Sequence, residues 1–353
     1  MGKGDQVRIA VIGLGFGVNH ARSAMLVPEA KLVAVCDLNE GRGASAREWQ
    51  VPFYTDFRRM LDEVNPDGVV AAVSNNQHAE VATECLRRGI PTLLEKPIAP
   101  TLEEADQIIT AGRESGTPLL IGHHRRFSAF VLKAREIVQG GKIGELVGAN
   151  ILWTILKPRD YYNTKWRTRR ATGGGPLLIN TIHDIDDLRF ITGREVVRLQ
   201  AELSNRVRGL EVEDTISLSL RMEGDVLVTI FTADCVPSLW AYESTTSPWE
   251  NPYFFYAPGD CYYFFGTQGT FTLPQLRRVY YPDPQREGWQ WPLTVERLGV
   301  QPVHPLREEM RHFCAVVRGE AEPRTSGEDA RRTLEVVLGI MRAGETGQPV
   351  TFA

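Results

Sequence analysis

The sequence is poor in cysteine and has no long hydrophobic run. Its five cysteines are scattered over 353 residues and form no C-x-x-C pair, which argues against a zinc cluster or a disulfide framework. No apolar stretch reaches the roughly 18 residues that a membrane-spanning helix needs. The first residues run straight into a strand pattern and lack the apolar region of a signal peptide. We therefore expect a cytoplasmic protein with reduced thiols.

Neither sign of charge dominates the chain. Its 40 basic and 44 acidic residues give a net charge of −4, and no block of Lys and Arg is present. The basic surface of a nucleic-acid-binding protein is therefore not expected. A hydrophobic fraction of 42% and a charged fraction of 24% are typical of a globular protein, and the length suggests two domains. We expect a small-molecule ligand, without nucleic-acid or membrane partners.

The first third of the chain alternates short apolar strands with helical segments. This alternation is typical of β-α-β units and a parallel sheet, so we predict an α/β Rossmann domain over residues 1–124. The expected strands are residues 7–13, 31–37, 67–74, 91–97 and 118–124.

After residue 125 the pattern changes to longer strands of an antiparallel type, which predicts an α+β domain over residues 125–353. A helix over 128–141 precedes them, and helices over 305–319 and 326–347 end the chain. The aromatic-rich segment 237–262 has no clear period and predicts no element. The expected strands are residues 145–155, 196–204, 214–223, 225–234 and 269–274.

The stretch "VIGLGFGVNH" places Gly13, Gly15 and Gly17 between the first strand and a helix start. Such glycines allow a tight turn and a close approach of the backbone to a pyrophosphate. The pattern G-x-G-x-x-G would put its third glycine at Val18, so Gly17 comes one residue early. Asp37 ends the next strand, where an acid can bind the adenosine ribose. These features predict a dinucleotide site.

The same aspartate indicates which dinucleotide binds. A carboxylate at position 37 repels the additional phosphate of NADP, and no arginine follows it directly. Arg42 lies a few residues further on, and a cation there could bind the additional phosphate, so NADP remains an alternative. We predict NAD, with NADP as the less favoured cofactor.

Lys96 follows the fourth predicted strand in "LLEKPIAP". Ligands bind at the carboxyl ends of parallel strands, and burial beside a cationic cofactor ring can lower a lysine pKa enough for proton transfer. Lys96 is therefore a candidate catalytic residue. The alternative at this stage is a solvated surface lysine beside a strand-ending proline.

His183 stands in "GGGPLLINTIHDIDD". If residues 177–190 are helical, Asp186 and Asp187 share its face. No further His or Cys donors lie nearby, so no metal site is expected. The three glycines upstream permit close approach of a ligand. We interpret His183 as a base or hydroxyl-binding residue steadied by Asp186, with a structural histidine as the alternative.

The order of these motifs resembles the Gfo/Idh/MocA oxidoreductase family over nearly the whole chain. The resemblance rests on "GLGFG", Asp37, Asn75 with His78, "EKP", "GHHRRF", "GKIGELV", "GGGPLL" with the distal histidine, and "GTQGTF". It implies an NAD(P)-dependent dehydrogenase of sugars, inositols or related polyols. It also implies a second domain with a large, open, mainly antiparallel sheet, and a homodimer or homotetramer.

The resemblance also implies roles for individual residues. Lys96 and His183 are the expected catalytic residues, and the Pro97 peptide bond is expected to be cis. The expected cofactor contacts are Gly13, Gly15, Phe16, Gly17, Asp37, Asn75, His78, Glu95, Lys96 and Pro97. The expected substrate contacts are Arg126, Tyr161, Trp166, Arg167, Asn180 and His183.

The chain departs from the family pattern at Ile179, where many members carry an aspartate four residues before the catalytic histidine. Asn180 is the nearest polar substitute. The prediction is an NAD-dependent dehydrogenase that oxidises a secondary hydroxyl of a sugar or cyclic polyol. Two alternatives stay open: a glycoside hydrolase that retains NAD, and a non-catalytic NAD-sensing protein.

Overall fold

The computed structural model describes residues 6–247 and 249–352. The chain divides into two compact units: Met1–His124 with Pro305–Leu334, and Arg125–His304 with Glu335–Ala353. The sequence predicted that all residues after 124 form the second domain, whereas in the structure Pro305–Leu334 belongs to the first unit. The reason is the helix α9 (Pro305–Val317), whose apolar side chains are part of the first unit's core.

The first unit contains a six-stranded, all-parallel sheet in the order β3-β2-β1-β4-β5-β6. This confirms the predicted Rossmann sheet. The two-residue edge strand β3 was not predicted, because so short a segment has no period to detect. The strands are β1 (Val7–Ile12), β2 (Ala30–Cys36), β3 (Phe53–Tyr54), β4 (Gly68–Ala71), β5 (Thr92–Glu95) and β6 (Leu119–Gly122).

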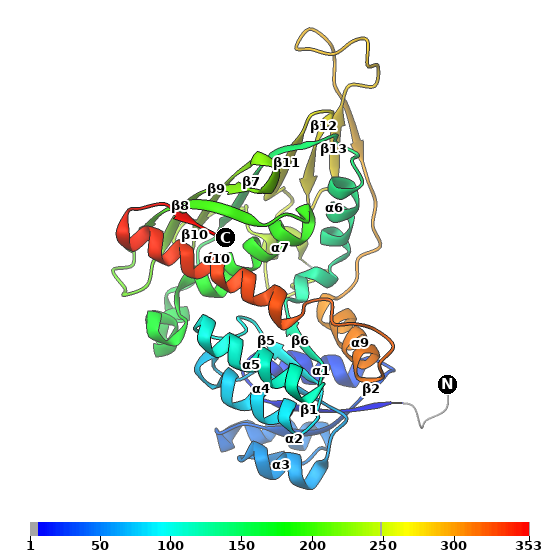
Figure 1. The fold of residues 1–353 in the computed structure, drawn as a ribbon, viewed down its shortest axis with the longest axis vertical. Helices are drawn as coiled ribbons and strands as arrows, with labels where there is room; N and C mark the ends of the chain where they lie inside the picture. The colour runs from blue at the N-terminus through cyan, green and yellow to red at the C-terminus, as the bar shows by residue number, and fades with distance from the viewer. Residues whose placement is uncertain (1–5, 248, 353) are drawn as a thin grey trace. The chain divides into compact units, whose positions relative to one another are not determined.

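Helices connect these strands, and Figure 1 shows α4 and α5 side by side. Side chains cap several of them: Asp56 accepts from the first backbone N–H groups of α3, and Thr101 caps α5. The α5 helix ends at Gly116, which adopts a left-handed conformation. The helices are α1 (Gly17–Leu26), α2 (Gly43–Trp49), α3 (Phe57–Val64), α4 (His78–Arg87) and α5 (Leu102–Ser115), together with α9.

The second unit contains a nine-stranded sheet in the order β14-β13-β12-β11-β7-β10-β9-β8-β15. All neighbours are antiparallel except β10 and β7. This confirms the predicted large, mainly antiparallel sheet. The strands are β7 (Leu146–Thr154), β8 (Val196–Ser204), β9 (Thr215–Met222), β10 (Val226–Ala233), β11 (Tyr262–Gly266), β12 (Gly269–Leu273), β13 (Arg277–Tyr280), β14 (Thr294–Arg297) and β15 (Val350–Thr351).

One face of this sheet packs against helices, and the other is open. Along β9, Ile216, Leu218 and Leu220 are buried, while Ser217 and Ser219 are exposed, as the period of two requires. The buried face shares its core with α6 (Ala129–Gln139), α7 (Ile182–Thr192) and the C-terminal half of α10 (Gly327–Thr346). The short helix α8 (Tyr242–Thr246) lies in the aromatic-rich segment. None of the described helices is both long and apolar enough to cross a membrane.

Candidate active site

The three glycines after β1 have different surroundings. Gly13 has a φ of +89°, and a Cβ there would lie 2.4 Å from the Ala72 carbonyl oxygen, so only glycine fits this turn. A Cβ on Gly17 would lie 3.1–3.2 Å from carbon atoms of β1 and Ala72, which indicates close helix–strand packing. A Cβ on Gly15 would meet nothing closer than 3.7 Å. Gly15 therefore leaves room for a phosphate at the start of α1.

Asp37 joins the end of β2 to the glycine turn. Its Oδ2 accepts a hydrogen bond of 2.7 Å from the backbone N–H of Leu14, and its Oδ1 accepts one of 2.8 Å from Asn39. The Arg42 Nε lies 3.7 Å from the same carboxylate. The aspartate thus fixes the shape of the glycine turn, and its carboxylate lies at the end of β2, the place where a dinucleotide ribose binds in such sheets.

Four predicted cofactor residues lie at one edge of the parallel sheet. Gly13, Asp37, Asn75 and Lys96 follow β1, β2, β4 and β5, and parallel strands present their carboxyl ends on the same side. Lys96 is half-buried, and its peptide bond to Pro97 is cis, as the resemblance implies.

His78 is buried beneath this edge. Its Nδ1 lies 2.8 Å from the carbonyl oxygen of Pro97, and its Nε2 lies 3.2 Å from that of Val73. Burial lowers its pKa, although the two carbonyls oppose the effect. This geometry ties the segment after β4 to the Lys96–Pro97 turn. We therefore assign His78 to positioning this turn, whereas the sequence predicted a cofactor contact.

Glu95 forms a buried cluster that the sequence did not reveal. Its Oε1 lies 2.6 Å from His20 Nε2, and the Nδ1 of His20 lies 4.0 Å from Glu309 Oε2 on α9. Burial would raise the pKa of Glu95, but the hydrogen bond and charge of His20, with the charges of His124 and Lys96, bring it below its usual range. Burial raises the pKa of Glu309 well above its usual range. The cluster therefore holds an ionised Glu95 next to Lys96 and a neutral Glu309.

The second unit carries His183. It is the second residue of α7, which follows a π-helical turn over Leu177–Thr181. The helix over the predicted segment is confirmed, and His183 is buried. Asn180, three residues earlier, accepts a hydrogen bond of 2.7 Å from the Lys157 ammonium. Lys157 is a further candidate that the sequence did not reveal.

Lys157 lies among aromatic rings at the end of β7. Its Nζ is 4.7 Å from the centroid of the Tyr161 ring, 5.4 Å from Trp153 and 5.8 Å from Tyr162. It is 3.5 Å from a carboxylate oxygen of Asp234, which follows β10. Burial lowers the pKa of Lys157 to about 8, although the Asp234 charge opposes this.

The predicted substrate residues Tyr161, Trp166 and Arg167 lie together in this part of the second unit. The Arg167 guanidinium is 4.0 Å from the Tyr161 ring centroid and 5.5 Å from that of Trp166. Trp166 is 41% exposed. These rings present an open aromatic surface next to two cations.

Arg126, the other predicted substrate residue with a positive charge, is buried in an ion pair. Its Nε and one NH2 group donate to both carboxylate oxygens of Asp186, at 2.8 and 2.7 Å, and its guanidinium lies over the Phe190 ring. The side chain is 3% exposed. We therefore assign Arg126 to the orientation of α7 instead of the predicted substrate contact. Asp186, predicted to steady His183, is held in this bidentate ion pair.

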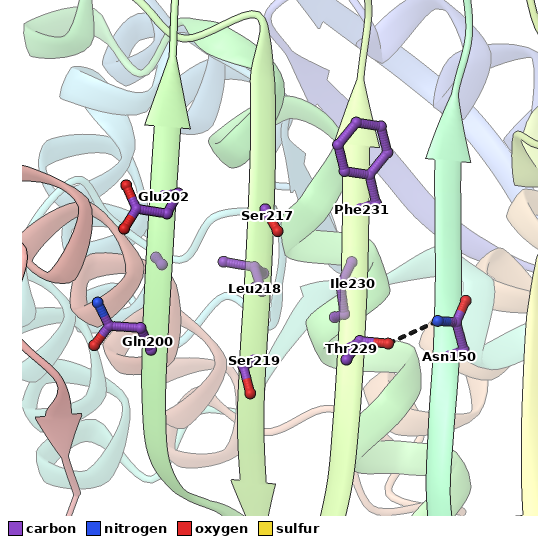
Figure 2. Close-up of a pocket in the computed structure, with 10 residues that line it drawn as sticks. Asn150, Gln200, Glu202, Ser217, Leu218, Ser219, Thr229, Ile230 and Phe231 are labelled. Atoms are coloured by element: carbon purple, nitrogen blue, oxygen red, sulfur yellow. Dashed lines mark hydrogen bonds between the residues drawn. The ribbon is translucent and has the colours of Figure 1, made fainter.

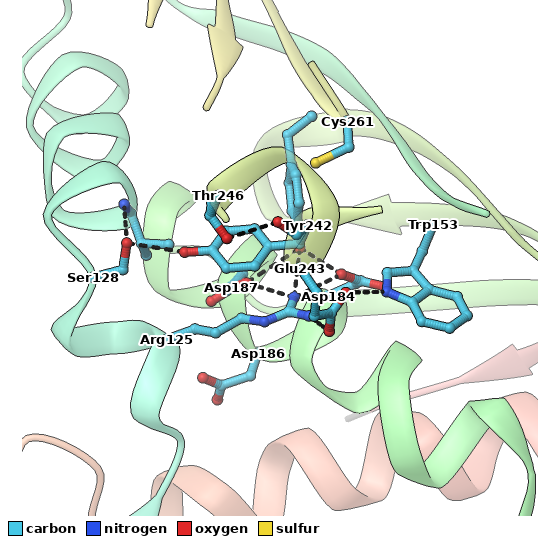
Figure 3. Close-up of polar contacts among 12 residues, drawn as sticks. Arg125, Ser128, Trp153, Asp184, Asp186, Asp187, Tyr242, Glu243, Thr246 and Cys261 are labelled. Carbon is cyan, nitrogen blue, oxygen red and sulfur yellow. Dashed lines mark hydrogen bonds and ion pairs between the residues drawn. The ribbon is translucent and has the colours of Figure 1, made fainter. Parts of the chain in front are cut away.

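Other acids after His183 belong to a buried polar network (Figure 3). Arg125 NH1 lies 3.0 Å from Asp184 and 3.2 Å from Asp187, and its NH2 lies 2.6 Å from Glu243. Three carboxylates thus surround one guanidinium. Burial raises the pKa of both aspartates, although Arg125 opposes it. The network anchors α7 to α8 and β11, where the Tyr262 hydroxyl donates to Asp184 at 2.5 Å.

One sequence signal could have found Lys157. It precedes Pro158 at the end of a strand in "TILKP", just as Lys96 precedes Pro97 in "LLEKP". Glu309 and Asp234 carried no such signal, because each meets its partners only through contacts between distant segments. Within the described residues, no group of three His, Cys, Asp or Glu side chains is arranged to hold a metal ion.

The first unit has the strand order, glycine turn and strand-end acid that define a dinucleotide-binding Rossmann domain. Residues 7–123 match the family model described as "Oxidoreductase family, NAD-binding Rossmann fold", and residues 131–272 match the GFO/IDH/MocA C-terminal domain. The chain belongs to the Gfo/Idh/MocA oxidoreductase family.

Several inositol dehydrogenases are similar to the chain. Inositol 2-dehydrogenase 2 of Saccharopolyspora erythraea is 33% identical over 64% of this chain and 66% of that protein, just under two thirds of its length. The scyllo-inositol 2-dehydrogenase (NAD(+)) of Bacillus subtilis is 26% identical over 98% of this chain and 96% of its own. The solved myo-inositol 2-dehydrogenase of Lactobacillus plantarum has a TM-score of 0.79 at 22% identity, covering 99% and 100% of the two chains, and supports the fold.

Proposed function

We propose that the protein is an NAD-dependent dehydrogenase that oxidises a secondary hydroxyl of a sugar, inositol or related cyclic polyol. The observation that carries this proposal is the glycine turn after β1, with open space at Gly15 and Asp37 beside it. Membership of the family and the inositol dehydrogenases among its relatives support the reaction class. A nicotinamide cofactor supplies the hydride acceptor in this chemistry.

The protein's own task is to hold the reactants and to accept the hydroxyl proton. Lys96 and His183 are the proposed proton-handling residues. The ionised Glu95, held by His20, keeps a negative charge next to Lys96. The proposed cofactor contacts are Gly13, Gly15, Phe16, Gly17, Asp37, Asn75, Glu95, Lys96 and Pro97. The proposed substrate contacts are Tyr161, Trp166, Arg167, Asn180 and His183.

The proposed cofactor is NAD, because the Asp37 carboxylate would repel the 2′-phosphate of NADP. Arg42, 3.7 Å from Asp37, is a cation that this carboxylate partly neutralises. Separate titrations of the protein with NAD and NADP measure the preference. Equal or tighter binding of NADP would contradict the assignment.

A screen of polyols and sugars with NAD tests the reaction. The expected result is stoichiometric formation of NADH and of the corresponding ketone. Release of an aglycone from a glycoside without net NADH formation would favour the NAD-retaining hydrolase instead. Tight NAD binding with neither product would favour the sensing protein.

We also propose a homodimer or homotetramer that buries the open face of the large sheet. A pocket lies between β7, β8, β9 and β10, and Figure 2 shows residues that line it, among them Asn150, whose amide donates a hydrogen bond to the Thr229 hydroxyl. Apolar side chains stand exposed on this face, among them Leu227 at 56% and Phe231 at 41%. Light scattering should show an oligomer, which Phe231→Glu should weaken. Leu132→Glu, at an exposed position on α6, is the control and should leave the oligomer intact. A monomeric unsubstituted protein would contradict the proposal.

A further inference from the structure

Lys157 has more hydrogen-bonding capacity than its surroundings use. Its ammonium carries three N–H donors, and its polar partners are the Asn180 amide oxygen at 2.7 Å and Asp234 at 3.5 Å. Within the described residues, the third donor has no acceptor. The side chain is only 8% exposed, so water compensates poorly for the missing hydrogen bond.

Arg167 presents a second cation without a matching acid. Its NH1 donates to the carbonyl oxygen of Tyr161 at 2.9 Å, and its Nε is buried without a hydrogen-bond partner. No carboxylate among residues 6–247 and 249–352 forms an ion pair with it. Its guanidinium and the Lys157 ammonium both contact the Tyr161 ring, at 4.0 and 4.7 Å from the centroid. Both cations therefore contact the same ring.

The nearby acids are committed to other groups. Asp234 also lies 2.7 Å from Arg208 Nε and accepts a hydrogen bond from the Tyr162 hydroxyl. The Asp214 carboxylate accepts from the backbone N–H groups of Val207 and Arg208 and from the Thr215 hydroxyl. Glu243, whose charge also acts on Lys157, is bonded to Arg125 and Trp153. Within the described residues, Asp234 is thus the one carboxylate that forms ion pairs with Lys157 and Arg208, and Arg167 has none.

We propose that the second unit recognises a carboxylate on the substrate through Lys157 and Arg167, so that the substrate is a sugar acid or other polyhydroxy carboxylate. This inference rests on the proposed dehydrogenase function. A carboxylate has the planar, two-oxygen shape that a guanidinium fork binds, and it supplies an acceptor for the free lysine donor.

The geometry also relates this carboxylate to the reacting hydroxyl. Asn180, which holds the Lys157 ammonium, precedes His183 by three residues on a continuous helical stretch. The junction of the π-helical turn and α7 lies between them, so they are about one helical turn apart along the chain. A carboxylate bound by Lys157 and a hydroxyl beside His183 would then belong to one small molecule, whose ring can stack on Tyr161 or Trp166.

The test compares matched pairs that differ only in the carboxylate: D-galacturonate with D-galactose, and D-glucuronate with D-glucose. Calorimetry on the NADH-loaded protein measures binding without turnover, and kcat/KM with NAD is measured in parallel. We expect each acid to bind tenfold to 100-fold more tightly than its neutral partner, the usual strength of charge-assisted hydrogen bonds.

Lys157→Met and Arg167→Gln should each bring the acid-to-neutral affinity ratio towards one. Asp234 keeps Arg208 and Tyr162 as partners in Lys157→Met, and thermal unfolding checks that the fold survives. The control is Lys133→Gln, which removes a positive charge from α6 whose partner is Glu136. An unchanged ratio in this control would exclude a general effect of net charge.

Equal affinity for acids and neutral sugars would overturn the inference, and so would an acid preference that both variants retain. Oxidation of neutral sugars would then leave the proposed dehydrogenase function standing. Conversely, tight binding of the acids that depends on Lys157 and Arg167, without NADH formation from any polyol, would sustain the carboxylate site and refute the dehydrogenase function.

Discussion

Replacement of Glu250 by glutamine should make the protein more stable at alkaline pH. The Glu250 carboxyl is buried, with one oxygen 2.5 Å from Ser128 Oγ and the other 2.7 Å from the Tyr242 hydroxyl. Burial raises its pKa to about 7, although these hydrogen bonds oppose the effect. Both hydrogen-bond partners are neutral, and the positive charge of Arg125 only partly offsets the effect of burial.

The size of the effect follows from the shift in pKa. The folded state binds the Glu250 proton more tightly than the unfolded state, whose glutamate titrates near 4.5. The stability linked to this proton is therefore fully present below about pH 4.5 and is lost as the pH rises through 7. A shift of two to three pKa units corresponds to roughly 3 kcal/mol of unfolding free energy. Glutamine resembles the protonated acid and does not ionise, so Glu250→Gln should avoid this loss.

Urea unfolding at about pH 5 and pH 9 measures the difference. Tryptophan fluorescence mainly follows the second unit, because it contains Glu250 and every tryptophan except Trp49. The variant should gain up to about 3 kcal/mol over the unsubstituted protein between the two pH values. Glu145→Gln, at an exposed position, is the control and should change little. The same pH dependence in Glu250→Gln and the unsubstituted protein would refute the reasoning.

Four further predictions concern the proposed active site. Asp37→Ser should reduce the preference for NAD, measured as the ratio of the Kd values for NADP and NAD; an unchanged ratio would place the discrimination elsewhere. Lys96→Ala should lower kcat by roughly 100-fold or more while the Kd for NAD stays within a few fold, and near-normal kcat would remove Lys96 from the mechanism. His183→Ala should lower kcat/KM and alter its low-pH limb, since only neutral imidazole accepts a proton; an unchanged rate and profile would mean a structural histidine. Binding of D-galacturonate to the NADH-loaded protein should weaken above about pH 8, because the Lys157 ammonium loses its proton there, and binding that is constant from about pH 7 to 9 would contradict that role.

Local patterns predicted most of the fold. The period of two along residues 196–204 and 225–234 identified β8 and β10 nearly to the residue, because one face of each strand is buried and the other is open. The strands β11, β13, β14 and β15 were missed. β11 begins in the aromatic-rich segment without a clear period, β13 and β14 contain no fully buried residue, and β15 is two residues long. The return of α9 to the first unit depends on which core accepts an amphipathic helix, and local sequence carries no such information.

In the candidate site, too, features that depend on local sequence could be predicted, and contacts between distant segments could not. The positions of Gly13 and Asp37 at strand ends could be predicted because each depends on one strand alone. The interactions of Arg126 and Glu309 could not, because they join side chains from distant elements. Gly17 shows a local rule that tolerates variation: it provides the helix–strand contact of a third glycine although it comes one residue early.

The place of α9 has a consequence for how the chain folds during synthesis. The core of the first unit contains Met310, Phe313 and Cys314 of α9. This core is therefore still incomplete when His124 leaves the ribosome. The missing helix follows only after the strands of the second unit, roughly ten to forty seconds later at ordinary rates of translation. During that interval, the apolar surface that α9 later covers stays exposed to solvent. We expect it to bind chaperones during translation, and a separately expressed fragment of residues 1–124 to aggregate unless α9 is supplied.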